Sequence, residues 1–92
     1  MLFVTEYRFK SHLTREDSKR LMDVFGKQGQ APGEIAHYVR VDGSGGFVVT
    51  DTDDPVATYE SVLGFVEFME FSSAPVLKID DAVGPILANL AE

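Results

Sequence analysis

Cysteine is absent from this 92-residue sequence. The chain therefore has no disulfide, no thiol nucleophile and no thiolate ligand for a metal ion, and we expect a reducing, cytoplasmic location. Basic residues are also scarce, because 8 Lys and Arg stand against 15 Asp and Glu, which gives a net charge of −7. Proteins that bind the phosphate backbone of nucleic acids present a basic face, so we expect no nucleic-acid partner.

Long apolar runs are missing too. No stretch approaches the roughly 18–20 consecutive apolar residues of a transmembrane helix, and the first residues lack the basic and apolar regions of a secretory signal. We therefore expect no membrane partner and no secretory leader. The length suits a single domain over residues 1–92, with a modest core, because a domain of this size buries only about 60–65% of its unfolded surface.

The sequence does contain alternating strand and helix patterns. Residues 2–10 alternate with the period of a strand, and the stretch is apolar on both faces at its start. Thr14, followed by two acidic residues, is typical of a helix start. Gly26 and Gly29 predict the end of that helix, since glycine is favoured just past a helix C-terminus.

A β-hairpin is predicted next, with strands over residues 35–41 and 47–51 and a glycine-rich turn at 42–46. A glycine cluster can also cradle a phosphate, but a phosphate loop opens a helix. Here the cluster lies between two strands and is followed by Phe47. The hairpin turn is the better interpretation.

A second helix is predicted to begin at Asp53 or Asp54 as the cap, with Pro55 at its first position. Its apolar stripe continues as far as Met69. The acidic cluster at its start, which includes Asp51, does not have the spacing of an EF-hand loop, so capping is preferred over metal binding. Three phenylalanines at intervals of three, at positions 65, 68 and 71, are expected to pack in the core or an interface rather than form a stacking site.

The end of the chain is predicted to hold one more strand and a short helix. Pro75 precedes a strand-like run over residues 76–79. Asp80 and Asp81 are expected to cap the terminal helix, and its regular part is expected to begin at Pro85.

The predicted order of strand, helix, strand, strand, helix, strand and helical tail is that of a ferredoxin-like α+β sandwich. In this fold a four-stranded antiparallel sheet carries two helices on one face. Two helices leave the other face open, and the first strand begins apolar on both sides. We therefore expect the open faces of two copies to meet in a homodimer.

Three stretches of the sequence resemble a known family: residues 1–4, residues 46–54, and Glu70-Phe71 followed by Pro75-Val76-Leu77. They are similar to small proteins of the dimeric α/β-barrel superfamily, and most of all to a domain-of-unknown-function family within it. That family typically comprises single-domain bacterial or phage proteins. The resemblance implies the ferredoxin-like fold. The superfamily includes cofactor-independent monooxygenases, haem-degrading enzymes and small isomerases, with active sites in the barrel lumen or beneath the helices. None of their catalytic sets matches this sequence, so no catalytic residue and no cofactor is assigned.

The two histidines, His12 and His37, are far apart in the sequence and have no carboxylate at ligand spacing. No metal site is therefore expected. His12 is predicted to lie in an exposed loop. His37 is predicted to be a partly buried structural residue rather than a catalytic one.

One cluster predicts a ligand site on the open face of the sheet. The apolar positions Phe3, Thr5, Tyr7 and Phe9, with Ile35, His37, Val39 and Val41, are expected to face the helices. Strand alternation then sends the opposite set to the open face, and this set comprises Glu6, Arg8, Tyr38, Arg40, Thr50 and Lys78. Its excess of basic groups suits a small carboxylate or phosphate ligand. The alternative is a ladder of cross-strand ion pairs that fixes the strand register.

Three functions remain open at this stage. The first is a small homodimeric binding or accessory protein without catalysis. The second is a cofactor-independent enzyme of the monooxygenase or isomerase type, acting on a small anionic organic molecule in the barrel lumen. The third follows from charge: residues 1–46 carry seven basic and six acidic residues (net +1), while residues 47–92 carry one basic and nine acidic residues (net −8). Such an acidic surface either blocks a basic partner or simply keeps the protein soluble.

Overall fold

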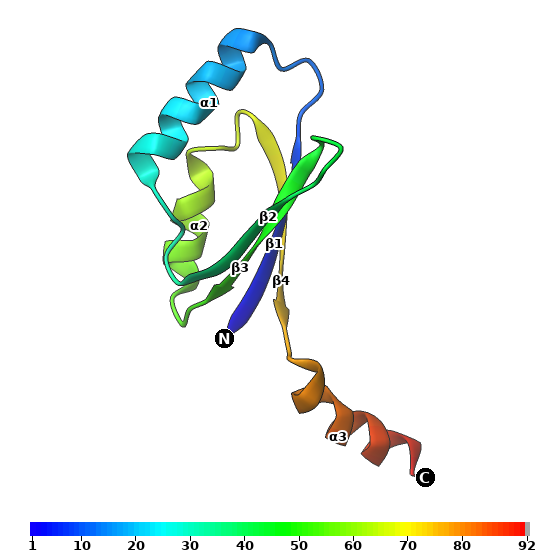
Figure 1. Cartoon of the computed structure of the whole chain (residues 1–92). Helices are drawn as coiled ribbons and strands as arrows, with labels where there is room; N and C mark the ends of the chain where they lie inside the picture. Colours follow the sequence, from blue (N-terminus) through cyan, green and yellow to red (C-terminus); the bar gives the residue numbers. More distant parts are fainter. Residues whose placement is uncertain (92) are drawn as a thin grey trace.

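The computed structural model describes residues 1–91, which form an α+β fold (Figure 1). Its elements are β1 (Leu2–Phe9), α1 (Arg15–Gln28), β2 (Glu34–Val39), β3 (Gly45–Asp51), α2 (Pro55–Leu63), β4 (Met69–Val76) and α3 (Ile79–Leu90). The strands form one antiparallel sheet in the order β2-β3-β1-β4. Helices α1 and α2 lie over the same face of this sheet. The predicted ferredoxin-like arrangement is confirmed.

Helix α1 begins and ends where the sequence predicts. The Thr14 hydroxyl accepts from the Asp17 N–H at 3.1 Å, and the Asp17 carboxylate accepts from the Thr14 N–H at 2.9 Å. This reciprocal pair satisfies two amides that the first turn leaves free. The Thr14 N–H, helped by Arg20, lowers the pKa of Asp17 to about 2. At the other end Gly29 adopts a φ of 71° and donates its N–H to the Phe25 carbonyl at 3.0 Å.

The β2–β3 hairpin is also confirmed. Gly43 has a φ of 77° in the turn, and the Arg40 N–H donates to the Gly45 carbonyl at 2.8 Å. Gly46 then lies directly opposite Tyr7 of β1. A Cβ atom at Gly46 would lie 2.6 Å from the Tyr7 hydroxyl oxygen, so this glycine leaves the space that the Tyr7 ring fills.

The prediction that the second helix continues to Met69 is wrong. Helix α2 ends at Leu63, and β4 begins at Met69, seven residues before the predicted last strand. These residues form a strand rather than a continuation of the helix, because Met69 to Val76 pairs with the whole length of β1. Phe68 is 1% exposed and anchors the join, where its carbonyl accepts from the Lys10 N–H at 2.9 Å. Tertiary pairing here overrides the helical period.

Two expectations about the C-terminal segment are also wrong. Pro75 lies inside β4, not before the last strand, and β4 is an edge strand, where proline is tolerated. Helix α3 begins at Ile79 and contains Pro85, instead of beginning there. Asp80 and Asp81 lie in its first turn, where they favour the positive end of the helix dipole, and Lys78 occupies the cap position.

The predicted sheet faces are right for β1 and need correction elsewhere. Thr50 pairs with Phe3 and therefore shares its helix-facing side, not the open side. A β-bulge between Glu34 and Ala36 takes Ile35 out of the alternation, so Ile35 is exposed and Glu34 faces the helices instead. Val41 lies beyond the end of β2 and is fully exposed.

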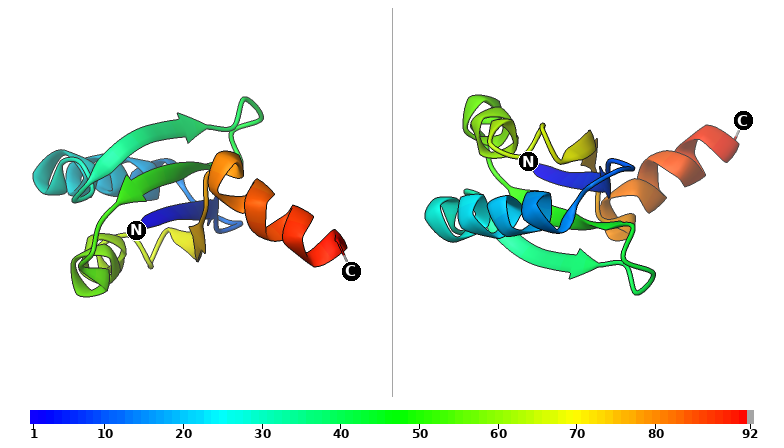
Figure 2. Two further views of the ribbon diagram at one scale, coloured as in Figure 1. Left: turned by 90° about the horizontal axis from the view of Figure 1, so that it is seen from below. Right: turned by 90° about the horizontal axis from the view of Figure 1, so that it is seen from above.

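Little of the molecule is a packed core. Within residues 1–91, the large apolar side chains that are buried are Tyr7, Phe68 and Met69. Helix α3 leaves the end of β4 and extends away from the sheet, as Figure 2 shows from below and from above. Each helix in this part of the chain is too short or too polar to cross a lipid bilayer.

A methyl group at Gly46 tests the packing of Tyr7. We expect Gly46→Ala to lower the free energy of unfolding by about 1–3 kcal/mol, because its Cβ would overlap both the Tyr38 carbonyl oxygen of the neighbouring strand and the Tyr7 hydroxyl. Urea denaturation measures the change. Gly26→Ala is the matched control: its Cβ would meet nothing within 4 Å, and alanine in a helix should add about 0.5–1 kcal/mol. Equal stability of the two variants would contradict the packing.

Candidate functional site

A cavity of about 320 Å³ lies between the sheet and the two helices that cover it. Its walls are mainly apolar and come from β1, β3, β4, both helices and the segment after α2: Phe9, Leu21, Met22, Phe25, Val48, Val62, Phe65, Met69 and Phe71. Side chains of the covering layer still reach the sheet, because Leu21 and Val24 of α1 and Phe65 after α2 pack against the core of Tyr7, Phe68 and Met69. The volume is at the lower end of the range for small-molecule sites.

Two polar contacts hold the helices in place around this cavity. The Gln28 side-chain amide of α1 donates to the Ser61 carbonyl of α2. On the other side Arg20 of α1 forms an ion pair with Glu67, and its guanidinium lies 5.4 Å from the centre of the Phe68 ring. These contacts tie α1 to α2 and to the loop before β4, while the interior beneath them stays open.

Polar side chains converge at the sheet side of the cavity. The Tyr7 hydroxyl lies 2.7 Å from Nε2 of His37, and Nδ1 of His37 lies 3.8 Å from a carboxylate oxygen of Glu34. Tyr7 belongs to β1 and His37 to β2, and β3 runs between them. Because Gly46 of β3 has no side chain, Tyr7 reaches across that strand to His37. The three side chains therefore form a polar chain from the middle of the sheet to its edge.

A fourth polar group completes this end of the cavity. Thr50 is buried, and its hydroxyl has no hydrogen-bond partner within residues 1–91. It lies opposite Glu34 in the β2–β3 register, on the face that the helices cover. Most buried hydroxyls in proteins are paired. Thr50 is therefore a buried hydroxyl beside the cavity whose hydrogen-bonding capacity is unused within residues 1–91.

The electrostatics of this end favour a neutral ligand that donates hydrogen bonds. Burial raises the pKa of the Tyr7 hydroxyl, so it stays protonated near neutral pH and can donate to His37. Its oxygen keeps a lone pair for a further donor. Glu34 is 13% exposed and adds a carboxylate. None of the lining residues within 1–91 is Lys or Arg, so the cavity offers an anion no permanently charged partner.

The residues predicted as an open-face ligand site do not all come together. Glu6 and Arg8 lie side by side on that face, 3.4 Å apart from carboxylate oxygen to guanidinium nitrogen. Tyr38 shares the face, in the row of Glu6, and packs its ring 5.4 Å from that of Phe47. Arg40 lies in the hairpin turn, 3.5 Å from a carboxylate oxygen of Asp42. A ligand role for these four stays a prediction.

The other two predicted residues lie elsewhere. Thr50 lines the cavity on the opposite side of the sheet, and Lys78 caps α3 beyond the end of β4. The expectation that they share the open face is wrong. The pairing of β3 with β1 turns Thr50 towards the helices, and Lys78 lies outside the sheet because β4 ends at Val76.

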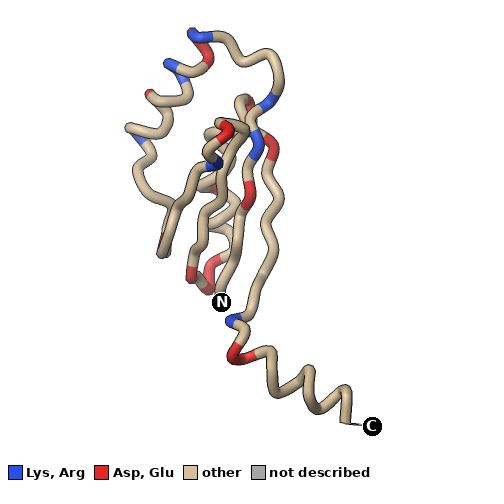
Figure 3. Tube along the Cα trace, turned by 45° about the vertical axis from the view of Figure 1, so that its right-hand side comes forward, with Lys and Arg blue, Asp and Glu red and all other residues tan. Residues whose placement is uncertain are grey.

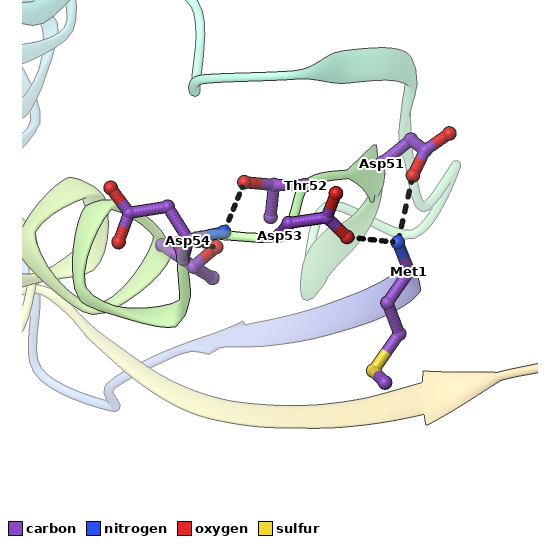
Figure 4. A network of polar contacts seen from close by, with 6 residues as sticks. Met1, Asp51, Thr52, Asp53 and Asp54 are labelled. Atoms are coloured by element: carbon purple, nitrogen blue, oxygen red, sulfur yellow. Dashed lines mark hydrogen bonds and ion pairs between the residues drawn. The ribbon is translucent and has the colours of Figure 1, made fainter.

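Several carboxylates of the acidic half make structural contacts. Figure 4 shows the amine of Met1 held between Asp51 and Asp53, each at 3.1 Å, and these carboxylates raise the pKa of that amine. Asp54 caps α2 by accepting from two backbone amides, those of Val56 and Ala57, at 3.1 Å each. The predicted capping by this cluster is confirmed.

Two of the four polar residues at this end of the cavity were placed correctly from the sequence. Sequence reasoning placed Tyr7 and His37 on the covered face, but treated His37 as structural. It missed Glu34, because the bulge at Ile35 is not visible in the alternation, and it put Thr50 on the other face. The signal that was available was Gly46: a glycine inside a strand often marks a close approach of another group.

The sequence profile of a family described as a domain of unknown function (DUF3303) matches residues 1–89. No curated protein matches the chain.

The raised pKa of Tyr7 gives a pH prediction. Since the folded protein holds the phenolic proton more tightly than the unfolded chain, stability should be unaffected below the ordinary tyrosine value of 10.0 and fall as the pH rises from there. Ultraviolet titration of tyrosinate, wild type minus Tyr7→Phe, should give a midpoint above 10.0. A midpoint at or below that value would contradict the burial of this hydroxyl.

Proposed function

We propose that this chain, which belongs to the domain-of-unknown-function family DUF3303, is a homodimeric binding protein for a small, mainly apolar organic molecule with a hydroxyl or amine group. The observation that carries the proposal is the cavity beneath the helices, apolar along its walls and lined at one end by hydrogen-bonding groups with free capacity. The proposal includes a cytoplasmic location and a bacterial or phage source. It includes no catalysis by the protein.

Size and chemistry both support a ligand of this kind. A cavity of about 320 Å³ accommodates a one- or two-ring molecule. Apolar walls reward the burial of such rings, and the aromatic residues among them allow edge-to-face contacts. Acceptor oxygens on Tyr7 and Glu34 can fix the orientation of a donor group. Without Lys or Arg in the lining within residues 1–91, a carboxylate or phosphate would be buried unpaired, at a high cost.

The homodimer is supported by the second face of the sheet. Helices α1 and α2 cover one face, and the apolar side chains on the other, such as Val4, Phe47 and Val49, remain without a covering layer in the chain. A sheet face of this composition is normally covered.

Proton transfer is the second candidate function, and one observation favours it. The hydrogen bond from Tyr7 to His37, with Glu34 beyond, is a route along which a proton can move. A bound enol or phenol would give its proton to the Tyr7 oxygen while the Tyr7 proton passes to Nε2 of His37. An isomerase-type reaction would return the proton to another atom of the ligand. Turnover, rather than binding alone, distinguishes this candidate.

The acidic blocking protein is the least supported candidate, because part of the acidic cluster is used in structural contacts. Asp51, Asp53 and Asp54 are engaged at Met1 and at the cap of α2, and Glu67 pairs with Arg20.

Three related probes test the proposed function by calorimetry: 2-naphthol, naphthalene and 2-naphthoate. They share a ring system and differ in having a donor, no polar group or a negative charge. We expect 2-naphthol to bind most tightly and 2-naphthoate most weakly. Tyr7→Phe should weaken 2-naphthol by about five-fold, which corresponds to one hydrogen bond of about 1 kcal/mol, and leave naphthalene unchanged.

Tyr38→Phe is the matched control, because Tyr38 lies on the open face and its loss should not change any of the three affinities. The proposal is wrong if none of the probes binds, if 2-naphthoate binds best, or if Tyr38→Phe and Tyr7→Phe have the same effect. Conversion of 2-naphthol or another enolisable ligand to a product would favour the proton-transfer candidate.

A further inference from the structure

Helix α3 makes no broad contact with another element within residues 1–91. It extends from the end of β4 into solvent (Figures 1 and 2). Its large apolar side chains are exposed, with Leu87 at 60% and Leu90 at 70%. An exposed apolar patch of this kind is characteristic of an interaction surface.

The sequence of α3 is that of a helix with one apolar side, which is usually covered by another surface. Its large apolar residues recur at helical spacing and fall on one side: Ile79, Val83, Ile86, Leu87 and Leu90. After Asp81 it carries no charged residue as far as Ala91, as the uncoloured trace in Figure 3 shows. Twelve residues are marginal for a free helix in water, and Gly84 and Pro85 weaken this one further. Tertiary contacts therefore have to supply its stability.

The open face of the sheet is a second surface that lacks a cover. Its centre is apolar, with Val4 of β1 next to Val49 of β3 and Ala74 of β4. Phe47 and Tyr38 continue it towards β2 and are both exposed. Helix α3 of the same chain points away from this face, so the two apolar surfaces do not meet within one molecule.

The surface area of the chain gives the size of the missing contact. A compact monomer of 10.1 kDa exposes about 5,300 Å², whereas this chain exposes 6785 Å². Its radius of gyration is 16.2 Å, against about 12 Å for a compact domain of this length. The excess of about 1,500 Å² per chain lies within the range of about 1,000–2,500 Å² that each subunit of an obligate homodimer buries.

We infer that α3 of each subunit packs its apolar side on the open sheet face of a second copy of the chain. A two-fold axis gives both copies the same contact, so each unpartnered surface covers the other. Residues 82–91 carry no charged side chain, so α3 itself adds no charge to be desolvated, and Glu6 and Arg8 on the sheet face are already paired with each other. The inference deepens the homodimer of the proposed function and does not depend on the ligand of the cavity.

The absence of cysteine makes a disulfide test direct, because each introduced thiol is the only one in its chain. Ala74→Cys, labelled with ¹⁵N, reports on the open face, and unlabelled Leu87→Cys reports on the apolar side of α3. The two proteins are unfolded together, refolded, oxidised and weighed as intact species. We expect the mixed-isotope disulfide dimer to dominate. Ala88 lies on the opposite side of α3. When Ala88→Cys takes the place of Leu87→Cys, the yield of the mixed disulfide dimer should be at least five-fold lower.

Four results would overturn the inference: no disulfide dimer, a dimer that joins only like variants, equal yields with Ala88→Cys, or an intramolecular disulfide in the doubly substituted chain. Sedimentation of the wild-type protein separates the two proposals. A wild-type dimer without the mixed disulfide rejects the exchange of α3 but retains the homodimer. A wild-type monomer rejects both, and binding of 2-naphthol by that monomer would still support the cavity as a ligand site.

Discussion

The chain has too little interior for the apolar surface that it carries, and the rest of its structure depends on this constraint. Tyr7, Phe68 and Met69 are the large apolar side chains buried in residues 1–91, and they hold β1 to the start of β4. A cavity lies between the helices and the sheet, the other face of the sheet has no covering layer within residues 1–91, and α3 extends away from the sheet. We propose a different occupant for each: a small molecule beneath the helices, and a second copy of the chain on the sheet face and on α3.

Gly46 shows how one residue connects the sheet to the chemistry of the cavity. By leaving β3 without a side chain at this point, it lets Tyr7 cross from β1 to His37 on β2. The crossing buries the phenol, which raises its pKa and keeps it protonated, and Glu34 lies behind the imidazole. A polar chain embedded in apolar walls is an orienting site for a donor group. The same chain is the most direct route for a proton if the protein proves to be an enzyme.

The sequence was sufficient for features that depend on local chemistry. The Thr14 helix start, the glycine hairpin and the helix start at Asp54-Pro55 all followed from residue type and spacing. It failed where distant pairing decides the outcome. The apolar period of α2 continues past Leu63, yet Met69 pairs with Phe9 and belongs to β4. The bulge at Ile35 and the phase of β3 decided which residues face the cavity, and neither is encoded in alternation alone. The cavity itself arises from the spacing between layers, which a pattern of residue types does not specify.

Native mass spectrometry of the freshly purified protein tests most directly whether the chain binds a second copy of itself and a small molecule. Gentle ionisation preserves both subunit contacts and molecules held in a cavity. The account predicts a species of twice 10.1 kDa with additional small-molecule mass, which is released when the complex is denatured. A bare single chain of 10.1 kDa at micromolar concentration, with stability unchanged by dilution, would contradict it.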